Sequence, residues 1–349
     1  MDILTAIYGP GRGGSERAAL RLVAAWRDLG HRVTVLGEAG DGAARPLSLA
    51  RQIVRHGHQG PPDILFAPGQ TYALPFALAH VLARPGHRYA PPLVTKISNM
   101  PSPADRWALH WLSLQKRWTT KMVAPDRASQ DELHRMIGGS VDRFAFVANP
   151  AAERGHLSHL HAIKPAAAGP LRLLAIGRLV PQKNFALLIE AFCKIATPAD
   201  QLTVLGEGPE RVRLERQANA SGLDIRLPGF RADPAAELAA ANAFASTSDF
   251  EGLPAVLIEA LAVGLPIAAT ASSPAVTALL NDEQLGLLTP VNDVQAMAGA
   301  LQRLRTFRPD RRAMYAAALH FTAEEAAPAY IRLFEGLADF RKTAKRALA

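Results

Sequence analysis

Short apolar segments alternate with helix-length amphipathic segments along the chain, and this alternation limits the fold more than any other feature. Residues 2–7 form an apolar segment, a glycine-rich turn follows, and an amphipathic stretch runs from Ser15 to about Leu29. Ser15 is a favourable helix N-cap and Gly30 a favourable helix end. Strands that alternate with helices lie parallel in one sheet. Further strands are predicted at residues 32–36, 63–67, 93–97, 121–124 and 144–148.

The same pattern restarts in the second half. Residues 161–170 (HAIKPAAAGP) have the composition of a linker. Strands follow at residues 171–176, 201–205, 225–227, 243–247 and 266–270, and a helix at 185–195. A chain of 349 residues is long enough for two domains. We predict an N-terminal domain (1–165), a C-terminal domain (166–322) and a helical tail (323–349). The tail is expected to pack back across the domain boundary.

The basic excess lies in the first half of the chain. Residues 1–168 contain 20 Lys and Arg against 12 Asp and Glu, an excess of eight, whereas the remainder contains 19 of each. This asymmetry suggests an anionic partner for the first half, with a merely solubilising surface as the alternative. We expect no nucleic acid partner.

The single cysteine and the hydropathy pattern suggest a compartment. Cys193 leaves no intrachain disulfide, which fits a reducing environment, and its apolar surroundings predict a small core residue. The N-terminal segment lacks a signal-peptide pattern, and no uncharged apolar run approaches the ~18 residues of a spanning helix. We expect a cytoplasmic protein, or one attached to the cytoplasmic face of the membrane.

The glycine-rich turn after the first strand has three interpretations. Residues 9–14 (GPGRGG) satisfy G-x-G-x-x-G between a strand and a helix, and Glu38 follows the second strand, as in dinucleotide-binding folds. An NAD-dependent dehydrogenase that uses Gly9–Gly14 is therefore one alternative. A second is a general anion site made by the backbone of Gly13 and Gly14 and the helix start. A third is a purely structural turn.

Two motifs in the second half bear on chemistry. Residues 177–184 (GRLVPQKN) follow a predicted strand and open a helix, and residues 251–261 (EGLPAVLIEAL) hold two acids separated by seven residues. These motifs resemble the signature of glycosyltransferase family 4, whose members are retaining enzymes. The resemblance extends through residues 171–305 and is looser in the first half. It implies an α/β GT-B fold, in which two Rossmann-like domains face an interdomain cleft.

The resemblance also implies roles for individual residues. Arg178 and Lys183 would bind the donor pyrophosphate and stabilise the negative charge that grows as the nucleotide diphosphate leaves. Glu259 would accept hydrogen bonds from the ribose hydroxyls, and Glu251 would face the donor sugar. Backbone N–H groups for the sugar or phosphate would come from Gly252 and Leu253, and in the first domain from Gly13 and Gly14.

The resemblance therefore predicts a retaining glycosyltransferase of the hexosyl type. Front-face attack assisted by the leaving phosphate requires no protein nucleophile, and no Ser-His-Asp or Cys-His order stands out. The resemblance implies no cofactor and no metal, because GT-B enzymes generally work without a bound metal, and no carboxylate or His/Cys cluster is visible in the sequence. The predicted substrates are a nucleotide-diphosphate sugar and a glycan or lipid-linked acceptor, in polysaccharide or glycolipid biosynthesis. The alternatives are a GT-B-fold sugar-nucleotide epimerase, the dehydrogenase, and a non-enzymatic sugar-nucleotide binder.

The sequence departs from the family at two places. Relatives often have a histidine near the donor sugar after a central strand, and Ser98 occupies that position here, followed by Asn99. Either Ser98 or Asn99 contacts the sugar or acceptor, or the contact is lost. Residues 272–275 (SSPA) replace a common Gly-Gly followed by Pro-Glu, which would alter the shape of the donor pocket.

A segment rich in tryptophan suggests a membrane contact. Trp107, Trp111 and Trp118 are spaced to lie on one face of a helix, with basic residues interleaved. A basic helix with an indole stripe is typical of a membrane interface, so one hypothesis is docking on an anionic bilayer. The alternative is an ordinary core helix with aromatic packing.

Overall fold

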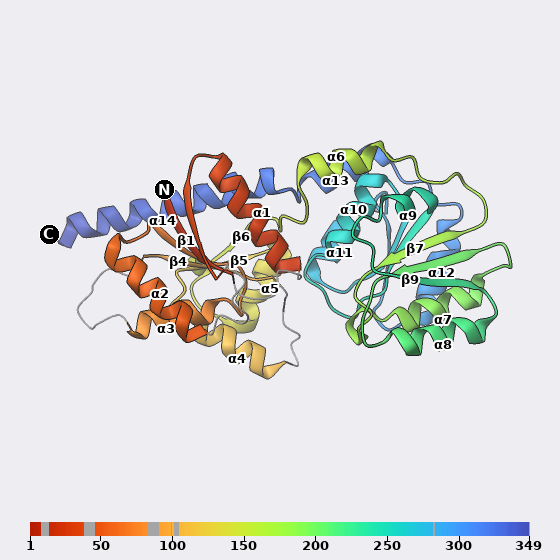
Figure 1. The fold of residues 1–349 in the computed structure, drawn as a ribbon, viewed down its shortest axis with the longest axis horizontal. Helices are drawn as coiled ribbons and strands as arrows, with labels where there is room; N and C mark the ends of the chain where they lie inside the picture. The colour runs from red at the N-terminus through yellow and green to blue at the C-terminus, as the bar shows by residue number, and fades with distance from the viewer. Residues whose placement is uncertain are drawn as a thin grey trace. The chain divides into compact units, whose positions relative to one another are not determined.

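The computed structural model describes residues 1–7, 14–37, 46–82, 91–98, 100, 105–281 and 283–348. The chain forms two compact units, one made of Met1–Glu153 and Thr322–Ala349 and the other of Arg154–Phe321. Figure 1 shows the helices and strands of both units. Among the described residues, each unit contains one parallel sheet of six strands, so that each unit is Rossmann-like.

The sheet of the first unit has the strand order β2-β1-β3-β4-β5-β6. Its strands are β1 (Asp2–Ala6), β2 (Arg32–Leu36), β3 (Ile64–Ala67), β4 (Leu93–Lys96), β5 (Lys121–Ala124) and β6 (Phe144–Phe146). Its helices are α1 (Gly14–Asp28), α2 (Pro46–Gln59), α3 (Ala73–Leu82), α4 (Arg106–Gln115), α5 (Arg127–Ile137) and α14 (Ala323–Leu348).

The C-terminal helix belongs to the first unit. Helix α14 lies beside α1, as Figure 1 shows, although almost 300 residues separate them in sequence. Trp26 of α1 packs edge-on against Phe66 of β3 and Tyr330 of α14, with ring centroids 5.1 and 5.8 Å apart, and its indole N–H donates to the carbonyl oxygen of Ala327 (3.3 Å). The predicted return of the tail to the first domain is therefore confirmed.

The sheet of the second unit has the strand order β12-β11-β10-β7-β8-β9. Its strands are β7 (Arg172–Ile176), β8 (Gln201–Leu205), β9 (Asp224–Gly229), β10 (Ala243–Ser246), β11 (Ile267–Thr270) and β12 (Leu287–Thr289). Its helices are α6 (Arg154–Ala162), α7 (Phe185–Ile195), α8 (Arg211–Ser221), α9 (Ala235–Ala240), α10 (Ala255–Val263), α11 (Pro274–Leu280), α12 (Val294–Leu304) and α13 (Arg311–Leu319). The predicted α/β fold with two Rossmann-like domains is confirmed.

The predicted tryptophan stripe does not form. Helix α4 ends at Gln115, so Trp118 lies beyond it and packs against the core of the first unit. Trp107 is 86% exposed, whereas the indole N–H of Trp111 donates to the carbonyl oxygen of Gln70 (3.2 Å). The prediction of one continuous indole face was wrong because the helix ends too early.

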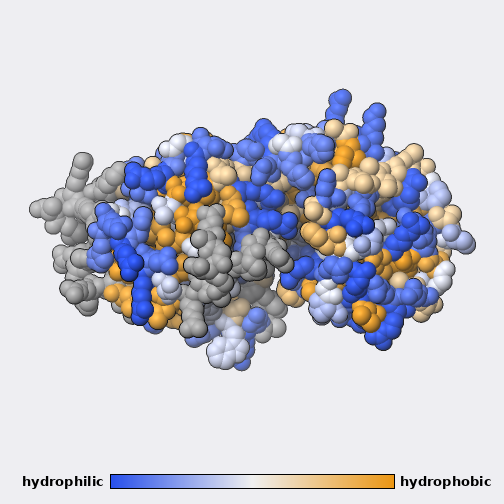
Figure 2. All heavy atoms as spheres, viewed as in Figure 1, coloured by the Kyte–Doolittle hydropathy of each residue, from blue (hydrophilic) through white to orange (hydrophobic). Residues whose placement is uncertain are grey.

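Three further findings concern side-chain exposure, the surface and the helices. Cys193, which we expected in the core, is exposed, because Ile189 and Phe192 occupy the buried face of α7. The visible face of the described residues mixes hydrophilic and hydrophobic side chains over both units (Figure 2). None of the described helices combines the length and the apolar character needed to span a bilayer.

Candidate functional site

The strand order of the second unit places two predicted motifs next to each other. The order reverses between β7 and β10, and ligands of open parallel sheets bind at such a point, outside the carboxyl ends of the strands. Residues 177–184 follow β7 and residues 247–254 follow β10. The topology thus brings both motifs to the edge of the sheet where a ligand is expected.

The segment after β7 is held by a close backbone contact. Gly206, after β8, has a φ of 145°, and a Cβ at this position would lie 1.8 Å from the carbonyl oxygen of Gly177. The N–H of Leu179 also donates to the carbonyl oxygen of Glu207 (2.8 Å). Only glycine fits position 206, because any side chain would push residues 177–179 away from β8.

Hydrogen bonds that involve the backbone join the two segments. The N–H of Asp249 donates to the carbonyl oxygen of Gln182 (2.9 Å), and the Gln182 side-chain amide donates to the carbonyl oxygen of Phe250 (2.8 Å). The hydroxyl of Thr247 donates to the carbonyl oxygen of Lys183 (3.0 Å). The backbone around Lys183 is therefore fixed by the segment that leads to Glu251.

Lys183 and Glu251 form an ion pair at the centre of this arrangement. Their side chains are 15% and 10% exposed, and the hydroxyl of Ser248 donates to the same carboxylate oxygen (2.9 Å). Arg178 lies in the same segment as Lys183 but is exposed, and its guanidinium forms no hydrogen bond or ion pair with any described residue. The structure thus brings Lys183 and Glu251 together and leaves the Arg178 guanidinium in solvent.

The start of α10 has unpaired backbone donors. Pro254 occupies the N-cap and provides no side-chain cap, unlike Ser273 at the start of α11. Within the described part of the chain, the N–H groups of Gly252 and Leu253 donate to no acceptor. The hydroxyl of Ser273 donates to the carbonyl oxygen of Gly252 (2.6 Å), so this serine fixes the turn before α10. A helix start with unpaired N–H groups favours an anion.

Glu259 lies inside α10 and has a partner that we did not predict. Its carboxylate is 3.6 Å from the Nε2 atom of His156 on α6, and its side chain is 17% exposed. Helix α6 packs on α10, and its last two residues are the first two of the segment predicted as a linker. The sequence held no signal for this pair, because a contact between residues about 100 positions apart depends on how the two helices pack.

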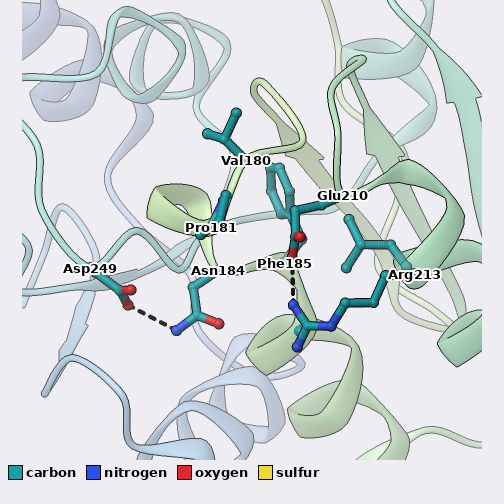
Figure 3. A pocket seen from close by; sticks show the side chains of 9 residues that line it. Val180, Pro181, Asn184, Phe185, Glu210, Arg213 and Asp249 are labelled. Atoms are coloured by element: carbon teal, nitrogen blue, oxygen red, sulfur yellow. Dashed lines mark hydrogen bonds and ion pairs between the residues drawn. The ribbon is translucent and has the colours of Figure 1, made fainter.

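A cavity of about 210 Å³ lies beside the two segments (Figure 3). Figure 3 shows Asn184 and Asp249 pointing toward each other, with the Asn184 amide donating to the Asp249 carboxylate (2.8 Å). The cavity is lined by side chains of both signs, including Glu210 and Arg213, but not by Lys183 or Glu251. These two predicted site residues therefore lie outside this cavity.

The predicted residues of the first unit are only partly described. Gly14 is the exposed first residue of α1, whereas Gly13, Glu38 and Asn99 lie outside the described residues, as does most of the GPGRGG turn. Ser98 is half-buried, and its N–H donates to the side-chain oxygen of Gln70 (3.1 Å). Among the described residues, no group of three or more His, Cys, Asp or Glu side chains is placed to hold a metal ion.

Residues 159–321 match the family model described as "Glycosyl transferases group 1". The chain is 31% identical over 134 residues to a lipopolysaccharide core biosynthesis glycosyltransferase of Rhizobium meliloti. This matched region covers 38% of each protein. It is 35% identical over 141 residues to the N-acetylgalactosamine-N,N'-diacetylbacillosaminyl-diphospho-undecaprenol 4-alpha-N-acetylgalactosaminyltransferase of Campylobacter jejuni. This matched region covers 40% of this chain and 37% of that protein. The matched regions thus span less than two fifths of either relative.

Solved structures match over a greater length. The Anabaena protein HepE in complex with UDP has a TM-score of 0.76 at 21% identity and covers 96% of this chain and all of that chain. The lipopolysaccharide outer core galactosyltransferase WaaB in its apo form has a TM-score of 0.74 at 16% identity and covers 97% of this chain and 99% of that chain. At this identity the likeness shows the GT-B fold.

Proposed function

We propose that this chain, a member of the glycosyl transferases group 1 family through residues 159–321, transfers a sugar with retention from a nucleotide-diphosphate donor to a glycan or lipid-linked acceptor. The observation that carries the proposal is the Lys183–Glu251 pair at the sheet's reversal point, beside a helix start with unpaired N–H groups. The proposed sugar transfer is a step of polysaccharide or glycolipid biosynthesis, as are the activities named for the relatives in Rhizobium and Campylobacter. We place the reaction in the cytoplasm, where a lone cysteine stays reduced.

In this proposal the donor pyrophosphate replaces the carboxylate of Glu251 as the partner of the Lys183 ammonium. Without donor, the carboxylate of Glu251 neutralises the ammonium and fixes its position. When the pyrophosphate arrives, Lys183 and the exposed Arg178 bind its oxygens, and the N–H groups of Gly252 and Leu253 donate to it or to the sugar. Glu251 is then released toward the sugar hydroxyls, and Glu259 binds the ribose.

The chemical step needs stabilisation of the leaving group. Negative charge grows on the pyrophosphate oxygen as its bond to the sugar breaks, so cations already fixed beside it lower the barrier. The acceptor hydroxyl then bonds to the anomeric carbon and gives its proton to the leaving phosphate, so no protein nucleophile is needed. Donors fixed before the reaction are worth far more than mobile ones in a site with little water.

The proposal is tested by release of nucleotide diphosphate from a panel of nucleotide sugars in the presence of a glycan or lipid-linked acceptor. UDP is the first probe of binding, because a structure of similar fold holds UDP. We expect Lys183→Ala to lower kcat/KM by about a hundredfold. Lys194→Ala is the matched control, because Lys194 is an exposed lysine on α7 of the same unit. Equal rates for both variants would contradict the assignment.

Glu251→Gln separates the two proposed roles of Glu251, as the counter-ion of Lys183 and as a contact of the donor sugar. The substitution removes the competing charge from Lys183 while keeping a group that Ser248 can hold. We expect UDP to bind several-fold more tightly and turnover to fall, because the glutamine no longer competes for the cation and no longer serves the sugar as a carboxylate. Weaker binding of UDP would show that the pair does not lie in the donor site. Conversion of the donor sugar without nucleotide release would instead favour the epimerase.

A further inference from the structure

A lysine that has no counter-ion among the described residues is buried at the carboxyl end of β4 in the first unit. Lys96 is 2% exposed, and among the described residues its ammonium contacts only the hydroxyl oxygen of Ser98, at 3.4 Å. An ammonium has three donors, and its burial without a carboxylate is unfavourable. Burial accordingly lowers the pKa of Lys96 to about 8.

Lys96 belongs to a small polar cluster, in which Ser98 contacts Lys96 and Gln70 joins Ser98 to Gln115. The hydroxyl of Ser98 donates to the carbonyl oxygen of Pro68 (3.3 Å), so its lone pairs face the ammonium. The side-chain amide of Gln115 donates to the carbonyl oxygen of Gln70 (2.9 Å), but its buried Oε1 atom accepts no hydrogen bond from the described residues. The cluster therefore has unused capacity of both kinds, an ammonium and an amide oxygen.

The cluster lies where a parallel sheet binds its ligand. The strand order of the first unit reverses between β1 and β3, and β3 is paired with β4. Pro68 and Gln70 follow the carboxyl end of β3, and Ser98 follows that of β4. This is the edge at which ligands of such sheets bind.

The charge of the first unit favours an anion. The residues of this unit include 23 Lys and Arg against 16 Asp and Glu, an excess of seven, whereas the second unit has 16 against 15, an excess of one. A unit of this charge raises the local concentration of anionic ligands. The counter-ion that Lys96 lacks within the described chain can therefore come from a substrate.

We propose that Lys96 and Ser98 bind an oxyanion, phosphoryl or carboxylate, of the acceptor, and that the Gln115 Oε1 atom accepts a hydrogen bond from an adjacent hydroxyl. In naming the acceptor, this proposal rests on the proposed function; the oxyanion site itself does not. The ligand supplies the negative charge that the described part of the chain does not provide for Lys96. A neutral sugar cannot do so and binds poorly.

The test measures binding of three small probes by calorimetry or thermal shift. Glucose 1-phosphate and glucuronate carry the two kinds of oxyanion, and methyl glucoside is the neutral probe. UDP is present at saturation, so that the proposed donor site is filled and the probes report on the other unit. We expect at least one of the anionic probes to bind wild type more tightly than methyl glucoside. The probe that binds shows whether the site takes a phosphoryl group or a carboxylate.

Two variants of Lys96 are compared with one control. We expect Lys96→Met to weaken binding of the anionic probe by about tenfold or more, since a charge-assisted hydrogen bond is lost. Lys96→Gln is the second variant and should show the same loss. Arg55→Met is the control, because it removes one positive charge from an exposed position on α2 of the same unit and should keep the binding.

Each outcome decides the matter. Undiminished binding in both Lys96 variants overturns the proposal, and so does equal binding of the anionic and neutral probes to wild type. Equal losses in Lys96→Met and Arg55→Met also overturn it, because general electrostatics then suffices. If UDP produces no shift but the Lys96-dependent binding persists, the oxyanion site stands and the proposed transferase function fails.

Discussion

Lys96→Met is expected to stabilise the first unit at neutral pH. The pKa of Lys96 falls from its ordinary value of 10.5 to about 8 on folding, and the cause is burial. At pH 7 the lysine is protonated in both the folded and the unfolded chain, and the folded state bears the cost of the buried charge. Each pKa unit corresponds to about 1.4 kcal/mol, so the shift from 10.5 to about 8 means that the buried charge costs the folded state about 3 kcal/mol. Methionine has a similar length and carries no charge.

The sign of the pH dependence follows from the same numbers. Between pH 8 and 10.5 the unfolded chain keeps the proton that the folded chain has lost, so the stability of wild type rises with pH. The advantage of Lys96→Met should therefore be greatest below pH 8 and shrink as the pH rises toward 10.5. Urea unfolding of both proteins at pH 7, 9 and 10 measures this difference.

Tryptophan fluorescence reports on the unit concerned. All four tryptophans of the chain belong to the first unit, and Trp26 is fully buried there. Arg55→Met serves as the control and should change the unfolding free energy little at any pH, because its side chain is exposed. A Lys96→Met variant that is less stable than wild type at pH 7, or equally advantaged at pH 7 and pH 10, would refute the reasoning.

Three further predictions concern the framework of the two units. Gly206→Ala should cost more than about 3 kcal/mol of unfolding free energy, because its Cβ would lie 1.8 Å from the carbonyl oxygen of Gly177; denaturant unfolding measures this. Burial alone would raise the pKa of Asp200, but its hydrogen bonds to Arg305 and to backbone N–H groups hold the pKa below the ordinary value. Asp200→Asn should therefore lower the unfolding free energy by roughly 2 kcal/mol at pH 7, and by progressively less as the pH falls through the acidic range. Trp26→Ala should cost roughly 3–5 kcal/mol and release α14, which hydrogen exchange in that helix would detect.

Regular elements were predictable where local signals agreed. Helix α7 was predicted at residues 185–195 and has those bounds, because Asn184 provides an N-cap and the apolar residues recur at helical spacing. The first helix was predicted to start at Ser15 and starts at Gly14. All the strands of the described residues except β12 were predicted, because short apolar runs stand between polar turns.

The misses share a physical cause, since each depends on what lies across the fold. Helix α4 ends at Gln115 without a glycine or proline to mark the end, so the tryptophan spacing extended it too far. Cys193 is exposed because packing decides which face of α7 meets the sheet. The pair of His156 and Glu259 joins two helices that the sequence does not place together.

Lys96 differs from these cases because its signal was present. A lysine inside a strand predicted to be central must be buried, and a buried lysine needs a partner that the local sequence does not supply. The second unit shows the opposite arrangement, in which Lys183 already has Glu251. A cation with an internal counter-ion must exchange it for the ligand, whereas a cation without one gains its counter-ion only from the ligand. The two lysines should therefore respond differently to substitution: loss of Lys183 leaves a carboxylate unpaired and destabilises the fold, and loss of Lys96 removes a cost and stabilises it.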